Sequence, residues 1–131
     1  MEHLKSLNSA DVRGKIVLVR VDHNVVKKGL IHDPYRIDAT ISTLFNIVSR
    51  GGKLILMTHV GRPKNKKTGE INISKDSSVE PIVEYLLKKL QVNFVIPKLE
   101  APDSFGIVEI AAPLKPYVDQ LRKGEIDGIY L

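Results

Sequence analysis

The stretch Ile55–Lys64, ILMTHVGRPK, joins an apolar run directly to a histidine, a glycine, an arginine and a proline. A second stretch, Val17–Val25 with the sequence VLVRVDHNV, ends its apolar run in a similar way on Asp22, His23 and Asn24. Apolar runs rich in β-branched residues are typical of strands that are buried on both faces of a parallel sheet. Each stretch is therefore predicted to be a strand that delivers polar side chains to the loop at its carboxyl end.

Strands and amphipathic helices alternate along the rest of the chain. Strands are predicted over residues 16–21, 53–58, 92–96 and 126–131, and helices over 35–50 and 79–90. Gly51 and Gly52 provide a stop for the first helix, and Ser77 with Glu80 fits a capping box for the second. Prolines interrupt the region from 97 to 116, so only a short helix over 116–123 is predicted there. This alternation predicts an α/β fold with a doubly wound, Rossmann-like three-layer parallel sheet.

The composition limits the possible classes of protein. A chain of 131 residues with 43% hydrophobic content fits one compact domain. The 20 Lys and Arg against 15 Asp and Glu give a net charge of +5, which favours an anionic partner without choosing between a metabolite, a nucleic acid and an acidic protein. The absence of cysteine excludes disulfides and thiolate metal sites. No apolar run reaches the roughly 20 residues of a membrane helix, and we expect a cytoplasmic protein.

The loops after the two opening strands are predicted to form one ligand site, because parallel sheets bind ligands beyond the carboxyl ends of their strands. Guanidinium forks and an imidazole there would suit phosphate or carboxylate oxygens, and Asp22 would accept a hydrogen bond from a ligand hydroxyl. The predicted ligand is therefore a small, hydroxylated phosphate or carboxylate. The candidate residues are Arg20, Asp22, Asn24, Arg36, His59 and Arg62.

Each candidate also has a purely structural interpretation. Arg20 could pair with a carboxylate at the sheet edge, and Asp22 and Asn24 could build a turn, as these residue types often do. Arg36 could be a solvated residue in the first turn of its helix, and His59 could be a satisfied structural histidine. The ligand interpretation is favoured by convergence, since two separate strands both end in ligand-type groups.

Four motifs, in this order, resemble the N-terminal lobe of phosphoglycerate kinase. They are RVDHNV at 20–25, DPYRIDATISTL at 33–44, LMTHVGRPK at 56–64 and SSVEPIVEYLLKKL at 77–90. The resemblance runs from about residue 15 to residue 131 and is weakest between 98 and 116. It implies an enzyme of glycolysis that transfers a phosphoryl group reversibly between 1,3-bisphosphoglycerate and ADP, giving 3-phosphoglycerate and ATP. It also implies two lobes that close on each other by a hinge.

The resemblance implies a role for each candidate residue. Asp22 and Asn24 would contact the hydroxyl and carboxyl end of the phosphoglycerate, and Arg62 would bind the phosphate that does not transfer. Arg36 would be the catalytic residue that stabilises the transferring phosphoryl group, and the two remaining candidates would complete the basic patch. No residue for a metal or a nucleotide is expected in this segment, because Mg-ATP or Mg-ADP would bind to the other lobe.

Some features depart from the family pattern. His23 stands where the family usually has an aromatic residue, and Val26 stands where it usually has a proline. The family continues with an LEN-x-RF segment just beyond the point where this chain stops. Residues 1–131 are therefore expected to be an incomplete N-terminal, phosphoglycerate-binding domain without the C-terminal nucleotide domain, inactive alone. The full-length enzyme is expected to be a monomer with no membrane or nucleic-acid partner.

Two other classes of protein remain as alternatives. The first is a free-standing basic α/β module that binds phosphorylated metabolites or nucleic acid, which the +5 charge and the lysines at 64, 66 and 67 favour. The absence of a nucleic-acid motif and of aromatic residues among the basic ones argues against it. The second is a dinucleotide-binding domain, but no G-x-G-x-x-G follows the first predicted strand.

Overall fold

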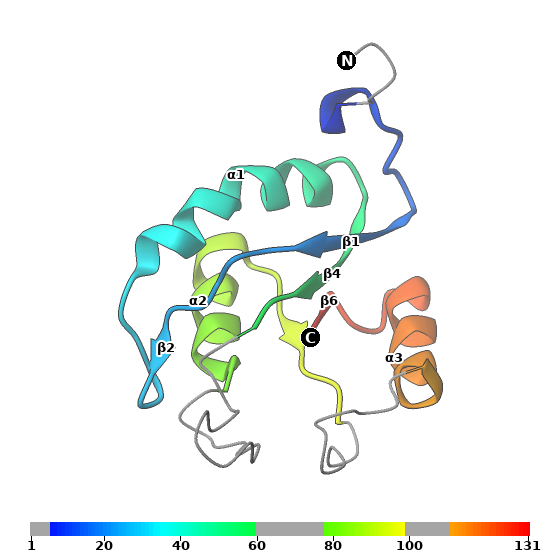
Figure 1. Cartoon of the computed structure of the whole chain (residues 1–131). Helices are drawn as coiled ribbons and strands as arrows, with labels where there is room; N and C mark the ends of the chain where they lie inside the picture. Colours follow the sequence, from blue (N-terminus) through cyan, green and yellow to red (C-terminus); the bar gives the residue numbers. More distant parts are fainter. Residues whose placement is uncertain (1–5, 60–77, 99–110) are drawn as a thin grey trace.

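A four-stranded parallel sheet forms the centre of the protein (Figure 1). The computed structural model describes residues 6–59, 78–98 and 111–131. In the sheet, β1 (Ile16–Arg20) pairs with β4 (Lys53–Met57), which pairs with β6 (Gly128–Tyr130), and β5 (Phe94–Val95) forms the other edge. A short 3-10 helix over Leu7–Ser9 precedes β1. The predicted α/β fold with a parallel sheet is confirmed.

Helices cover both faces of the sheet, which gives the three predicted layers (Figure 1). On one face, α1 (Pro34–Ser49) and α2 (Glu80–Leu90) bury the larger core, which includes Leu54 and Leu56 of β4. On the other face, α3 (Ala111–Lys123) packs on a smaller core around Ile55. These three residues of β4 alternate between the two faces because successive side chains of a strand point in opposite directions. None of the helices in the described ranges is long and apolar enough to cross a membrane.

The strand register brings the ends of β1 and β4 together. The two strands pair in parallel over five residues, from Ile16 opposite Lys53 to Arg20 opposite Met57. The pairing continues past the strand end, since the Val21 N–H donates to the Met57 carbonyl at 2.9 Å. The loops that follow β1 and β4 therefore start side by side, as the sequence predicted.

A small hairpin between β1 and α1 was not predicted. Its strands are β2 (Val26–Lys27) and β3 (Leu30–Ile31), which pair in antiparallel fashion. The two turn residues, Lys28 and Gly29, have φ values of 52° and 74°, as a two-residue hairpin turn requires. Lys-Gly is a weaker signal for such a turn than Asn-Gly or Asp-Gly, and each strand has only two residues. These features made the hairpin hard to recognise in the sequence.

The predicted start of the last helix was wrong. We expected a helix over 116–123, but α3 begins at Ala111 and contains Pro113 and Pro116. Pro113 lies in the first turn, where backbone N–H groups have no partner within the helix in any case. The side chains that pack on the sheet share one face of the helix, and their burial outweighs the donor lost at Pro116. They are Leu114, Tyr117, Val118 and Leu121.

The ends of the first two helices were predicted with mixed success. The glycine stop of α1 is confirmed, because Gly51 follows the helix with a φ of 87°. The predicted capping box of α2 is wrong. The N-cap is Val79, whose apolar side chain cannot accept a hydrogen bond from the first turn of the helix. The backbone N–H of Glu80 instead donates to Oγ of Ser78 at 3.2 Å. Ser77, the first residue of the predicted box, lies outside the described residues.

Two leucines in neighbouring strands provide a test of this packing. Leu54→Ala should lower the free energy of unfolding by about 2–5 kcal/mol, since the side chain is fully buried beneath α1 and α2. Leu18→Ala is the matched control, because Leu18 is 58% exposed, and should cost less than about 1 kcal/mol. Urea unfolding followed by circular dichroism measures both. Equal losses for the two variants would contradict the assignment of the larger core to the α1 and α2 face.

Candidate functional site

Five of the six predicted site residues lie in the described part of the chain, at or near the carboxyl end of the sheet. Arg20 is the last residue of β1, Asp22 and Asn24 lie in the loop that follows, and His59 lies just after β4. Arg36 comes from the first turn of α1. The sixth, Arg62, lies outside the described residues.

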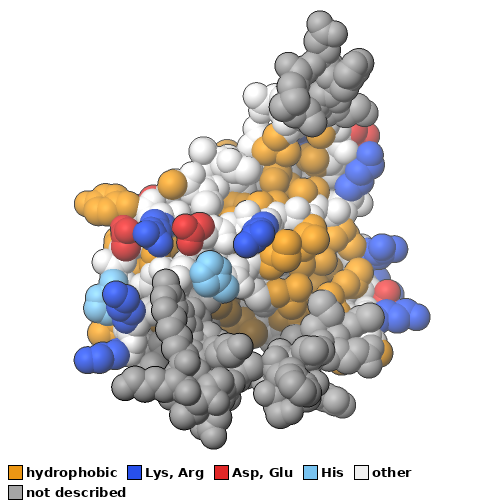
Figure 2. Space-filling view, in the orientation of Figure 1, with side chains coloured by type: hydrophobic (Ala, Val, Ile, Leu, Met, Phe, Trp, Pro, Cys, Tyr) orange, Lys and Arg blue, Asp and Glu red, His pale blue; other side chains and the backbone are white. Residues whose placement is uncertain are grey.

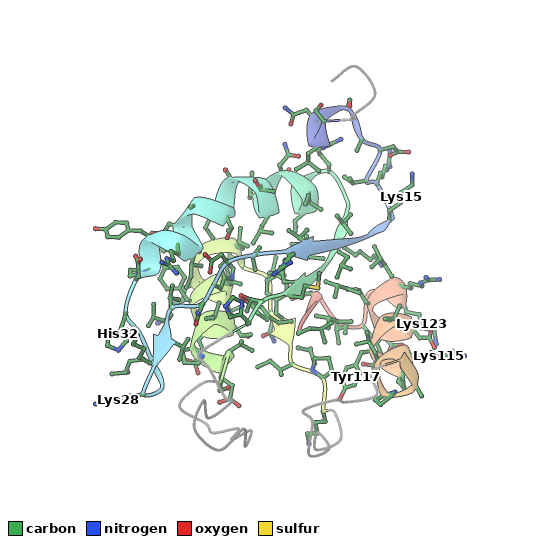
Figure 3. All side chains as sticks on the ribbon, viewed as in Figure 1. Lys15, Lys28, His32, Lys115, Tyr117 and Lys123 are labelled. Carbon is green, nitrogen blue, oxygen red and sulfur yellow. The ribbon has the colours of Figure 1, made fainter. Side chains whose placement is uncertain are left out.

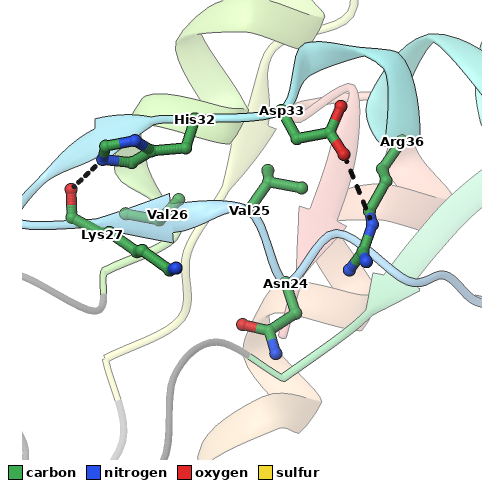
Figure 4. A pocket seen from close by; sticks show the side chains of 7 residues that line it. All are labelled: Asn24, Val25, Val26, Lys27, His32, Asp33 and Arg36. Carbon is green, nitrogen blue, oxygen red and sulfur yellow. Dashed lines mark hydrogen bonds and ion pairs between the residues drawn. The ribbon is translucent and has the colours of Figure 1, made fainter.

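The five described residues line two adjacent hollows. The first, of about 380 Å³, is lined by Arg20, Val21, Asp22 and His59. The second, of about 530 Å³, lies between the hairpin and the start of α1 (Figure 4). Its lining residues are Asn24, Val25, Val26, Lys27, His32, Asp33 and Arg36.

Two polar contacts connect the hollows. The Nδ2 atom of Asn24 lies 3.3 Å from Nε2 of His59, so the loop after β1 touches the loop after β4. Nη1 of Arg36 lies 3.8 Å from Oδ1 of Asp22, which links α1 to the loop after β1. The structure therefore brings Asp22, Asn24, Arg36 and His59 into one cluster, and Arg20 shares the first hollow with two of them.

Arg36 lies between two carboxylates. Besides Asp22, its Nε atom lies 3.6 Å from Oδ2 of Asp33 (Figure 4). The side chains of Arg36 and Asp22 are 52% and 70% exposed. Ion pairs this exposed contribute only about 0–1 kcal/mol each, so an anionic ligand can replace them at little cost. The guanidinium is thus oriented by its neighbours and still accessible.

The loop between Asp22 and Asn24 is a local turn. The backbone N–H of Asn24 donates to Oδ1 of Asp22 at 3.4 Å, which is the i to i+2 pattern of an Asx turn. The structural interpretation that the sequence left open for these two residues is therefore present. The turn uses one oxygen of the Asp22 carboxylate, and the carboxylate has a second oxygen and stays exposed.

The hairpin adds residues to the site that the sequence did not predict. Lys27, His32 and Asp33 line the second hollow together with Asn24 and Arg36 (Figure 4). His32 is held with Nε2 3.2 Å from the Lys27 carbonyl oxygen. These residues were missed because only the hairpin brings them to this place. The available signal was a Lys-Gly turn between two short apolar pairs.

Charges of both signs are interleaved around the hollows. Figure 2 shows acidic, basic and histidine side chains next to one another on one side of the viewed face, beside an apolar patch. Among residues 6–59, 78–98 and 111–131, no group of three or more His, Cys, Asp or Glu is placed to hold a metal ion. The side chains around the hollows can form hydrogen bonds to a ligand and stabilise charge on it.

His23, between the two loop residues, points into the core. Its side chain is fully buried, with Nδ1 2.5 Å from Oη of Tyr130 and Nε2 2.9 Å from Oγ1 of Thr40. Burial lowers the pKa of the His23 imidazole to about 4, and the nearby Asp22 carboxylate opposes this shift. The departure from the family pattern at this position is therefore accommodated by polar partners. At the second departure, Val26 starts β2 and is 3% exposed.

The fold and this cluster define an α/β protein of the kind that binds ligands beyond the carboxyl ends of parallel strands. The family model described as phosphoglycerate kinase matches residues 7–126. The chain belongs to the phosphoglycerate kinase family.

Individual relatives support this membership. The chain is 39% identical over 103 residues to phosphoglycerate kinase of Cereibacter sphaeroides, covering 78% of this chain and 24% of that protein. It is 34% identical over 119 residues to the cytosolic phosphoglycerate kinase of Trypanosoma congolense, covering 86% and 28%. The structure of phosphoglycerate kinase from Coxiella burnetii is similar with a TM-score of 0.58 and 25% identity, covering 69% and 22%. The chain thus spans about a quarter of the length of these relatives.

The buried imidazole predicts acid sensitivity. His23 has a pKa of about 4 in the folded chain and 6.5 as its ordinary value, so between these values the unfolded chain binds the extra proton. The contribution of neutral His23 to the free energy of unfolding should be fully present above pH 6.5. It should be lost as the pH falls towards 4, which lowers the free energy of unfolding by up to about 3 kcal/mol. Urea unfolding at a series of pH values measures this slope.

Two variants identify the source of the slope. His23→Gln should remove the loss in the upper part of this range, where carboxylates do not yet titrate. His32→Asn replaces an exposed histidine in the hairpin and should leave the loss in place. A wild-type chain whose stability stays constant from pH 6.5 to pH 5 would refute the assignment of a neutral, buried His23.

Proposed function

We propose that this chain supplies the phosphoglycerate-binding side of a phosphoglycerate kinase, which transfers a phosphoryl group reversibly between 1,3-bisphosphoglycerate and ADP in glycolysis. The observation that carries the proposal is the cluster of Asp22, Asn24, Arg36 and His59 at the ends of β1 and β4, in a chain of this family. Residues 1–131 would then belong to the N-terminal domain of the enzyme.

Phosphoryl transfer depends mostly on positioning and on stabilising charge, so it requires no nucleophilic side chain here. In the direction that makes ATP, a terminal oxygen of ADP attacks the acyl phosphate, and the bond to the carboxyl oxygen breaks to leave 3-phosphoglycerate. Arg36 is the proposed catalytic residue, because a guanidinium aimed at the moving group stabilises the charge on its oxygens. Arg20 and His59 would add positive charge and hydrogen bonds beside it.

The ion pairs of Arg36 fit this role. In the described structure its guanidinium faces Asp22 and Asp33, neither of which buries it. A ligand phosphoryl group would replace these carboxylates as the partner of Arg36. Asp22 would then turn its free oxygen to the substrate hydroxyl, and Asn24 would donate to the carboxyl end. Arg62 is the proposed ligand for the phosphate that does not transfer, and this role rests on its motif alone.

The rest of the reaction is proposed to lie with a second, nucleotide-binding lobe, which would hold Mg-ATP or Mg-ADP. Closure of the two lobes would exclude water from the phosphoryl group and so limit hydrolysis. We propose a monomeric enzyme in the cytoplasm. Relatives include proteins named cytosolic and one named glycosomal, the latter from Crithidia fasciculata at 36% identity.

Within residues 6–59, 78–98 and 111–131, the lysines labelled in Figure 3 lie on separate parts of the molecule, and this arrangement gives no support to the nucleic-acid alternative. Figure 3 shows Lys28 on the hairpin, Lys115 and Lys123 on α3 at the opposite side, and Lys15 near the start of β1. A nucleic-acid surface requires such residues to gather on one face. Binding to oligonucleotides that weakens steeply with salt and survives Arg36→Ala would favour the alternative instead.

Calorimetric titration of 3-phosphoglycerate into the 131-residue chain tests the proposal. Arg36→Ala should weaken binding by about 1.5–3 kcal/mol, the usual value of a charge-assisted hydrogen bond. Arg36→Lys should recover part of this loss, because lysine keeps the charge and lacks the planar fork.

Lys115→Ala is the charge control for this titration. It also removes one positive charge, but from α3, on the opposite side of the molecule from the hairpin (Figure 3). Its affinity for 3-phosphoglycerate should match that of the unchanged chain. If Arg36→Ala and Lys115→Ala bind equally well, Arg36 does not contact the ligand and the proposed site is wrong.

A further inference from the structure

His23 is bonded through every polar atom it has. Its backbone N–H donates to Oγ1 of Thr58, just after β4, at 3.0 Å, and its carbonyl accepts from the Val25 N–H at 2.8 Å. Its ring nitrogens reach Thr40 on α1 and Tyr130 on β6. One residue thus ties the loop after β1 to a helix and to two neighbouring strands.

The hydrogen bonds have a defined direction. The Oγ1 of Thr40 donates its single hydrogen to the Ile37 carbonyl at 2.7 Å, so it can only accept from the His23 ring. The proton of the neutral imidazole is therefore on Nε2, and Nδ1 is an acceptor. Tyr130 must then donate its hydroxyl hydrogen to Nδ1. Burial raises the pKa of Tyr130 well above its ordinary value, so the hydroxyl keeps the hydrogen that this chain of bonds needs.

The two residues beside His23 face the opposite way. Asp22 and Asn24 carry polar side chains that reach the two hollows, whereas the His23 ring is fully buried. The Asx turn joins Asp22 to Asn24 around His23, so fixing the ring inside the core fixes the turn that carries both neighbours. The Phe94 ring packs edge-on against the Tyr130 ring, with centroids 6.0 Å apart.

We propose that His23 is a positioning residue, whose neutral ring, bonded to Tyr130 and Thr40, directs Asp22 and Asn24 toward the ligand. The identity of that ligand rests on the proposed function, but the orientation of the loop does not. His23 itself touches no substrate, since its side chain has no exposed surface. An apolar ring of similar size would fill the same space, but it could not fix the rotation of the loop through two hydrogen bonds.

Nitrogen NMR on the histidine rings and the backbone amides tests the proposal without a ligand. At about pH 7 the ring of His23 should show a protonated Nε2 and a bare Nδ1. In Tyr130→Phe, which removes one hydroxyl, the amide signals of Asp22 and Asn24 should shift or broaden while those of α2 stay unchanged. Tyr85→Phe is the matched control: it removes an exposed hydroxyl that bonds Asp38 of α1, and it should leave both amides unchanged.

Binding provides the functional measurement. Tyr130→Phe should weaken 3-phosphoglycerate binding by about fivefold, the equivalent of one hydrogen bond, and Tyr85→Phe should not. Thr40→Val tests the other ring nitrogen and serves where Tyr130→Phe does not fold. A proton on Nδ1, or unchanged Asp22 and Asn24 amides in both folded variants, would overturn the proposal. If the unchanged chain binds no 3-phosphoglycerate, the proposed function fails, while the NMR result still decides the role of His23.

Discussion

The parallel register between β1 and β4 is the constraint on which the rest of the structure depends. It pairs the two strands over five residues, so that both strands end at the same edge of the sheet and the loops that follow them begin side by side. The register is held by burial, since Leu54 and Leu56 fill the core beneath α1 and α2 with no exposed surface. A slip of one residue would turn both leucines to the α3 side and separate the loops that form the cluster. The polar site therefore gets its geometry from an apolar interaction.

The charges at the site are balanced rather than simply basic. Arg36 is oriented by Asp22 and Asp33, and the exposure of all three keeps their attraction small. If these groups were buried, the carboxylates would hold the guanidinium so tightly that a ligand could not compete. Exposure thus lets the same contacts orient the arginine and still leave it able to exchange them for the proposed ligand. This explains how an acidic residue can lie inside the proposed site for an anion.

The sequence predicted those features that depend on local pattern. Buried apolar runs identified β1 and β4, and their parallel pairing follows from the intervening helix, so the meeting of Asp22 with His59 in one hollow could be foreseen. The hairpin could not, because two-residue strands have no readable period, and it alone brings Lys27 and His32 to the site. The long α3 was missed because burial of its apolar face outweighed two prolines. In each miss, tertiary contacts prevailed over local propensity.

The buried polar chain through His23 shows why a departure from a family pattern at one position requires a partner elsewhere. Tyr130 has no exposed surface, so its hydroxyl must find a partner within the protein. With a purely apolar ring at position 23, that hydroxyl would lose its acceptor, at a cost of about 1–3 kcal/mol. Histidine at 23 and tyrosine at 130 are 107 residues apart and form one physical unit. A change at one of them should cost least when the other changes with it, because a half-satisfied polar pair is less stable than either a complete pair or a fully apolar one.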